Sequence, residues 1–108
     1  MAIRELTLTH YQAGMVLAPV KGEVREVVRI TVFGPDFPER AVAPEILVGE
    51  APAESVSVAR DQRSIRGFLP QMPAEGAVIR VRYGDSQEGV LGEPFRRDQV
   101  RALPKECQ

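Results

Sequence analysis

Hydrophobic and polar residues alternate along much of the chain with a period of two, which is the pattern of β-strands that bury one face. The clearest example is the stretch Glu23–Phe33, in which Val28, Ile30 and Val32 share one parity. We predict a strand here whose three aliphatic side chains face a core, while Arg29 lies on the opposite face.

The same alternation predicts further strands in both directions along the chain. Residues 3–10 alternate, and residues 15–17 form a short apolar segment. The remaining predicted strands cover residues 45–48, 55–59, 64–69, 77–83 and 90–91. Only a short polar reversal separates 55–59 from 64–69, so we expect these two to pair as a hairpin.

Glycine and proline mark the predicted ends of the strands. Gly14 is expected to end the first strand, and Pro19 with Lys21 and Gly22 is expected to form a turn before the long strand. Residues 34–44 contain several prolines and are predicted to be a loop.

Strands at intervals of roughly 8–12 residues without a long helix favour an all-β fold, either an antiparallel sandwich or a small barrel of about seven or eight strands. The chain has 108 residues, enough for one core. We assign residues 1–95 to this β domain. Residues 96–108 are predicted to form a C-terminal tail that is irregular or contains a short helix.

Charge and hydropathy exclude several classes of partner. The net charge is −1 and the isoelectric point is about 5.8, so the chain as a whole does not attract nucleic acid or anionic lipid. No apolar run approaches the roughly 20 residues that span a bilayer. The N-terminus lacks the basic and apolar regions of a secretory signal. We therefore expect no nucleic-acid partner, no membrane insertion and synthesis in the cytoplasm.

Residues that carry out chemistry are scarce. His10 is the only histidine and Cys107 the only cysteine, which excludes a triad with two imidazoles, a multi-histidine metal site and an intramolecular disulfide. Asp85 and Glu88 share a loop but offer too few ligands for calcium. We expect no catalytic site, no cofactor and no metal, and the chain is predicted not to be an enzyme.

Arginine is the most prominent polar residue, since it far outnumbers lysine and alternation directs several arginines away from the core. One interpretation is a solvated sheet face paired with glutamates. The other is a surface that attaches to an acidic protein. The predicted protein-contact surface comprises Arg29, Arg66, Arg80 and Arg82, with Arg60 and Arg63 on the neighbouring hairpin.

The order of several segments resembles the IPT/TIG family of immunoglobulin-like domains. Ile30–Phe37, with the sequence ITVFGPDF, resembles the strand, glycine and phenylalanine signature of that family. Three further segments are similar to family segments in the same order: 46–53, 64–70 and 76–89. The resemblance covers roughly residues 3–95 and implies an immunoglobulin-like antiparallel β-sandwich with a role in interaction. Phe37 is expected to plug one end of the sandwich.

The resulting hypothesis is a non-catalytic structural or interaction protein. It is expected to be a small subunit of a larger assembly, such as a virion decoration protein or a phage tail protein, with neighbouring subunits as partners. The alternatives are a carbohydrate- or protein-binding accessory module and an intracellular adaptor that pairs through a sheet edge. For a glycan, only Tyr11, Tyr83 and Phe68 could serve as stacking platforms.

Overall fold

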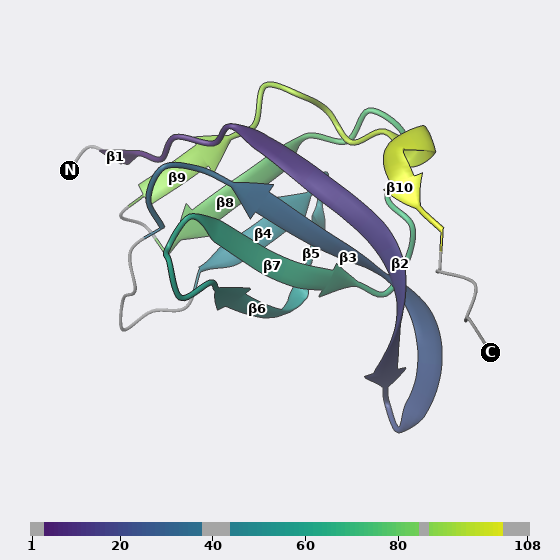
Figure 1. Cartoon of the computed structure of the whole chain (residues 1–108). Helices are drawn as coiled ribbons and strands as arrows, with labels where there is room; N and C mark the ends of the chain where they lie inside the picture. The colour runs from purple at the N-terminus through teal and green to yellow at the C-terminus, as the bar shows by residue number, and fades with distance from the viewer. Residues whose placement is uncertain (1–3, 38–43, 85–86, 103–108) are drawn as a thin grey trace.

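The computed structural model describes residues 4–37, 44–84 and 87–102. Within these residues the chain is all-β, and two five-stranded sheets pack face to face as an immunoglobulin-like β-sandwich (Figure 1). Sheet A has the order β1 (Arg4–Glu5), β9 (Gln87–Val90), β8 (Ile79–Tyr83), β4 (Glu45–Val48), β5 (Ala51–Pro52). Sheet B has the order β10 (Val100–Arg101), β2 (His10–Val20), β3 (Glu23–Phe33), β7 (Ser64–Leu69), β6 (Glu54–Val58).

The predicted all-β sandwich is confirmed, with more strands than expected. The difference lies in β5 and β10, which have two residues each and carry too little alternation to be recognised in the sequence. Most neighbouring strands are antiparallel, but β1 runs parallel to β9 and β10 runs parallel to β2. Strands β3 and β4 have the predicted bounds, and β6 pairs with β7 as the predicted hairpin.

The prediction for the N-terminal third was wrong in detail. The first strand covers only Arg4–Glu5, and β2 then runs without interruption through both Gly14 and Pro19. Gly14 pairs with Arg29 of β3, so the glycine does not break the strand. Pro19 is tolerated because no described strand pairs with the other side of β2 there, and the missing N–H of a proline costs no ladder hydrogen bond at a sheet edge.

The core lies between the two sheets, as the alternation predicts. Sheet B contributes Val28, Ile30 and Val32 from β3, which are at most 1% exposed. From sheet A, Ile79, Val81 and Tyr83 of β8 are at most 2% exposed. Two faces of period-two aliphatic residues therefore pack against each other.

Phe37 closes one end of this core. Its side chain is fully buried, and its ring packs against Gly34 so closely that a Cβ at Gly34 would lie 3.0 Å from the ring. The same Cβ would lie 2.5 Å from the backbone oxygen of Thr7. Glycine at position 34 thus allows the chain to turn back and insert Phe37 between the sheets.

The segment after the last strand of sheet A continues the sandwich. Phe95 is fully buried, a 3₁₀ turn covers Arg97–Gln99, and Val100–Arg101 adds β10 to sheet B beside Ala13 and Gly14. The predicted short helix is therefore a single 3₁₀ turn. Residues 103–108, which include Cys107, lie outside the described residues.

Candidate functional site

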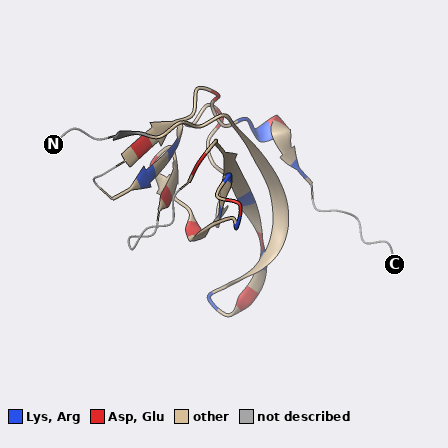
Figure 2. Cartoon of the chain, turned by 60° about the vertical axis from the view of Figure 1, so that its left-hand side comes forward, with Lys and Arg blue, Asp and Glu red and all other residues tan. Residues whose placement is uncertain are grey.

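The β2–β3 hairpin is longer than the rest of sheet B. Strand β7 pairs with β3 only as far as Val28, and β10 pairs with β2 only at Ala13 and Gly14. Beyond these points, residues 16–27 form a two-stranded ribbon that we call the arm. Figures 1 and 2 show it extending away from the sandwich. Both of its edges are unpaired among the described residues.

The arm ends in a tight turn that its sequence explains. Val20 pairs with Glu23, and the two residues between them, Lys21 and Gly22, have positive φ angles of 52° and 84°. Two successive positive φ angles define a type I′ turn, whose twist matches that of a β-hairpin. With about 3.4 Å per residue, the five residue pairs of the arm extend about 17 Å.

One face of the arm exposes apolar side chains. Leu17 and Val24 are 60% and 71% exposed, although they have the same parity as the core residues of their strands. Pro19, opposite Val24, is also exposed. The apolar parity thus continues past the end of the sandwich, interrupted by Glu26 opposite Leu17, and no second sheet of the described residues covers this face. The result is an apolar surface of the kind that marks a contact site in soluble proteins.

At its base the arm forms one wall of a small hollow. Ala18 and Val20 from the arm and Phe68 and Pro70 from the β7 region are among the residues that line this space of about 160 Å³. Strand β6 borders the hollow and is irregular, because Ser55 has a positive φ angle and the register with β7 shifts there. A bulge of this kind hinders pairing of the β6 edge with another strand.

The predicted contact arginines do not form one surface. Arg80 and Arg82 lie on the outer face of sheet A, where Arg80 approaches Glu88 at 3.8 Å and Arg82 approaches Glu45 at 3.5 Å. In this sheet, therefore, the interpretation as a solvated face paired with glutamates describes the arginines well. Half-exposed pairs of this kind contribute little to stability.

Arg29 and Arg66 lie on the opposite side of the molecule, on the outer face of sheet B. No carboxylate of the described residues is within ion-pair distance of either guanidinium. Arg60 follows β6 on the same side, and Arg101 in β10 lies beside Gly14. Arg63 in the β6–β7 turn donates its backbone N–H to the Asp61 carboxylate.

Two of the residues considered for catalysis and metal binding, His10 and Glu88, contact a neighbouring side chain on the protein surface. His10 is exposed and its ring stacks on Phe33 with centroids 4.4 Å apart and an interplanar angle of 5°. Glu88 pairs with Arg80, and Asp85 lies outside the described residues. Among the described residues no three His, Cys, Asp or Glu side chains are close enough to hold a metal ion. Nor does this part of the chain contain a helix long and apolar enough to cross a membrane.

The three rings considered for glycan stacking are mostly inaccessible. Tyr11 and Tyr83 are 7% and 2% exposed, and both belong to the core cluster. Phe68 is half-buried at the base of the arm. Only Phe68 therefore has a ring surface that a ligand could reach.

Comparison of the chain with protein-family models, with curated proteins and with solved structures finds no match. The arm was not identified from the sequence, although two signals for it were present. Val24 has the parity of the core residues of the long strand, and Lys21-Gly22 after the apolar stretch Met15–Val20 is typical of a two-residue hairpin loop.

Proposed function

We propose that this protein is a non-catalytic structural or interaction protein that joins a larger assembly of neighbouring subunits, such as a virion or a phage tail. The arm is the observation that carries the proposal. It extends beyond the sandwich, has two edges that are unpaired among the described residues, and exposes Leu17 and Val24.

The physical properties of the arm suit a protein partner. Complete burial of a Leu or Val side chain contributes about 1.5–3 kcal/mol, so a neighbour that covers Leu17 and Val24 gains substantially. The unpaired edges offer backbone donors and acceptors to an added strand, which is the chemistry of the sheet-edge adaptor alternative. An isolated two-stranded ribbon is only marginally stable in water, and a bound neighbour would support it.

The proposal includes an IPT/TIG-like origin for the sandwich. The resemblance of Ile30–Phe37 to the family signature gains support from the packing of Phe37 under Gly34. Domains of this type serve interaction in the proteins that contain them. The carbohydrate-binding alternative has less support, because Tyr11 and Tyr83 are buried in the core.

Light scattering on native and recombinant protein tests the proposal. The protein purified from its natural source is expected in a multi-copy particle, and the recombinant protein is expected to bind that particle or to self-associate. The double variant Leu17→Lys/Val24→Lys should fold normally, because both positions are exposed, and should remain a free chain of 11.9 kDa.

Val90→Lys is the matched control. Val90 is also an exposed apolar residue, at 57%, but it lies in β9 of sheet A, away from the arm. This variant should assemble like the unmodified protein. A monomer without partners in both preparations would overturn the proposal, and equal loss of assembly in both variants would exclude the arm as the contact.

A further inference from the structure

The outer face of sheet B contains a groove lined by arginines. Two hollows, of about 390 Å³ and 400 Å³, meet at Arg29 and Thr31. The first extends to Arg101 and the second to Arg60 and Arg66. We call this feature the arginine groove. It is separate from the apolar surface of the arm, and the inference drawn from it does not depend on the function of the arm.

The strand register explains the first hollow. Gly14 in β2 pairs with Arg29 on one side and with Arg101 on the other. Because glycine has no side chain, the position between the two arginines is empty, and space remains above the sheet. A Cβ at Gly14 would lie 3.6 Å from the Cβ of Arg101, which is an ordinary contact distance. The backbone therefore leaves room for a side chain at position 14, and the hollow is open because glycine has none.

The second hollow places hydroxyl groups beside an arginine. Arg66 in β7 pairs with Thr31 in β3 and with Ser57 in β6. Ser64 lines the same hollow. Hydroxyls next to a guanidinium provide additional donors for an oxygen-rich ligand.

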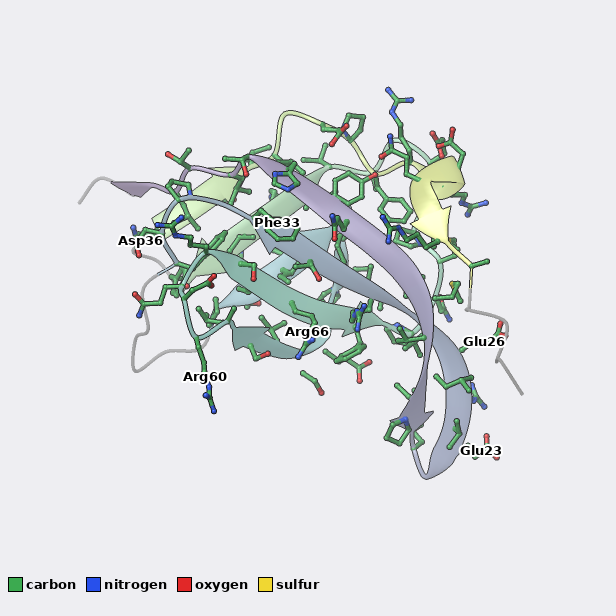
Figure 3. The ribbon with its side chains drawn as sticks, viewed as in Figure 1. Glu23, Glu26, Phe33, Asp36, Arg60 and Arg66 are labelled. Atoms are coloured by element: carbon green, nitrogen blue, oxygen red, sulfur yellow. The ribbon has the colours of Figure 1, made fainter. Side chains whose placement is uncertain are left out.

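The groove contains uncompensated positive charge. Its four arginines form no ion pair with a carboxylate of the described residues. In register, Glu54 in β6 is separated from Arg29 by Phe68 of β7. Figure 3 shows Glu23 and Glu26 on the arm, away from Arg60 and Arg66, and Glu23 already binds Arg25 at 3.1 Å.

From this arrangement we propose that the arginine groove binds an acidic, extended segment of another protein. With strands about 4.8 Å apart, the distance from β10 to β6 is about 19 Å, which about six residues of extended peptide would span. Carboxylates on such a segment would accept bidentate hydrogen bonds from the guanidinium groups, which are among the strongest in proteins. Their charge would also relieve the repulsion among the arginines.

A polypeptide fits the groove better than a nucleic acid does. Single strands of nucleic acid depend on a series of aromatic rings on which the bases stack, and neither hollow is lined by an aromatic residue. Phe68, which pairs with Arg29, is half-buried and lines the hollow at the base of the arm instead. One face of the nearby Phe33 ring is covered by His10. A duplex depends on a broad positive potential, and this chain has a net charge of −1.

Fluorescence anisotropy with a labelled octapeptide that has Glu at every second position tests the proposal, with the corresponding Gln peptide for comparison. The Glu peptide is expected to bind at least about tenfold more tightly, and its binding should weaken from about 50 mM to about 200 mM salt. Arg29→Gln/Arg66→Gln should weaken binding by about tenfold or more.

Arg80→Gln/Arg82→Gln is the matched control, because it removes the same charge from the outer face of sheet A. Its affinity should equal that of the unmodified protein. Gly14→Leu adds a steric test that retains all four arginines, and filling the first hollow should weaken binding. Circular dichroism verifies that each variant is folded. If the double variant Arg29→Gln/Arg66→Gln does not fold, Arg66→Lys replaces it; this variant retains the charge but loses the bidentate geometry, and it should preserve part of the affinity.

Equal affinity for the Glu and Gln peptides would overturn the proposal, as would an equal effect of the two double variants. A labelled eight-nucleotide thymidine strand is the third probe, and tighter binding of this strand than of the Glu peptide would assign the groove to a phosphate polymer instead. Leu17→Lys/Val24→Lys should bind the Glu peptide normally, so failure of the arm proposal and failure of this one give different results.

Discussion

The backbone N–H of Arg96 donates a hydrogen bond of 2.8 Å to the phenolic oxygen of Tyr11. The Tyr11 hydroxyl in turn lies 3.1 Å from the side-chain oxygen of Gln99, to which it donates. The Tyr11 ring also stacks near Phe95, with centroids 5.9 Å apart. One buried side chain of β2 therefore attaches the segment that leads into the 3₁₀ turn and β10, although the two parts of the chain are far apart in sequence.

Tyr11→Phe should destabilise the protein by about 1 kcal/mol, because it removes these hydrogen bonds and leaves the Arg96 N–H without its acceptor. Urea unfolding followed by circular dichroism measures the change. Arg96→Ala is the control, since it preserves the backbone N–H and should have little effect. If Arg96→Ala destabilised the protein as much as Tyr11→Phe, the hydrogen bond would not be the cause.

The same tyrosine makes stability sensitive to alkaline pH. Burial raises the pKa of Tyr11 above its ordinary value of about 10, although the hydrogen bond from Arg96 opposes the shift. The folded state therefore holds this proton more tightly than the unfolded state does. The resulting stabilisation is complete below about pH 10 and is lost as the pH rises through the folded-state pKa. The stability difference between the unmodified protein and Tyr11→Phe should shrink between about pH 8 and about pH 11, and an unchanged difference would contradict the prediction.

Val32→Ala and Val24→Ala should differ sharply, although both positions lie in β3 with the same parity. Val32 is fully buried and Val24 is 71% exposed. We expect the free energy of unfolding to fall by about 2 kcal/mol in Val32→Ala, because apolar surface is no longer buried and a cavity remains. In Val24→Ala it should fall by less than about 0.5 kcal/mol. Thermal and urea unfolding of the two variants provide the comparison. Similar losses would mean that the arm is covered in the isolated protein.

Gly34→Ala should be strongly destabilising, by about 1–3 kcal/mol, because its new methyl group would overlap the Thr7 carbonyl oxygen and the Phe37 ring. Gly92→Ala is the matched control, since a Cβ there meets nothing within 4 Å. Midpoints of urea unfolding measure both changes. Equal stability of the two variants would show that Phe37 can move away without cost.

A substitution in the turn of the arm should increase stability. Lys21 adopts φ 52°, a conformation that asparagine tolerates better than lysine does, so Lys21→Asn should stabilise the hairpin by up to about 1 kcal/mol. Hydrogen exchange of the arm amides should slow in this variant. Faster exchange, or no change, would contradict the assignment of a type I′ turn.

The alternation of residues predicted several parts of this structure correctly. It identified the core face of β3, the β6–β7 hairpin and the all-β sandwich, because burial of one strand face imposes a period of two on the sequence itself. It did not reveal β5 or β10, since two-residue strands are too short to display a period. The strand end predicted at Gly14 and the turn predicted at Pro19 were also wrong, because the effect of a glycine or proline on a strand depends on whether a neighbouring strand is present.

The candidate sites could be predicted only in part. The sequence indicated that Arg29, Arg66, Arg80 and Arg82 point outward, but not that they divide between two opposite faces. Glutamates of neighbouring strands compensate the pair in sheet A, whereas no described carboxylate pairs with the two in sheet B. The strand register decides this, and the register joins residues that are distant in sequence.

The sequence by itself determined which side of β3 faces the core, where the chain turns at Lys21 and Gly22, and that the fold is an all-β sandwich. Only the tertiary structure decided where sheet B ends along the β2–β3 hairpin, and hence that Leu17 and Val24 remain exposed. It likewise decided that Arg101 and Arg29 lie on either side of Gly14. The physical reason is that alternation is a local property of a strand, whereas exposure and charge compensation depend on the strands that pair and pack beside it.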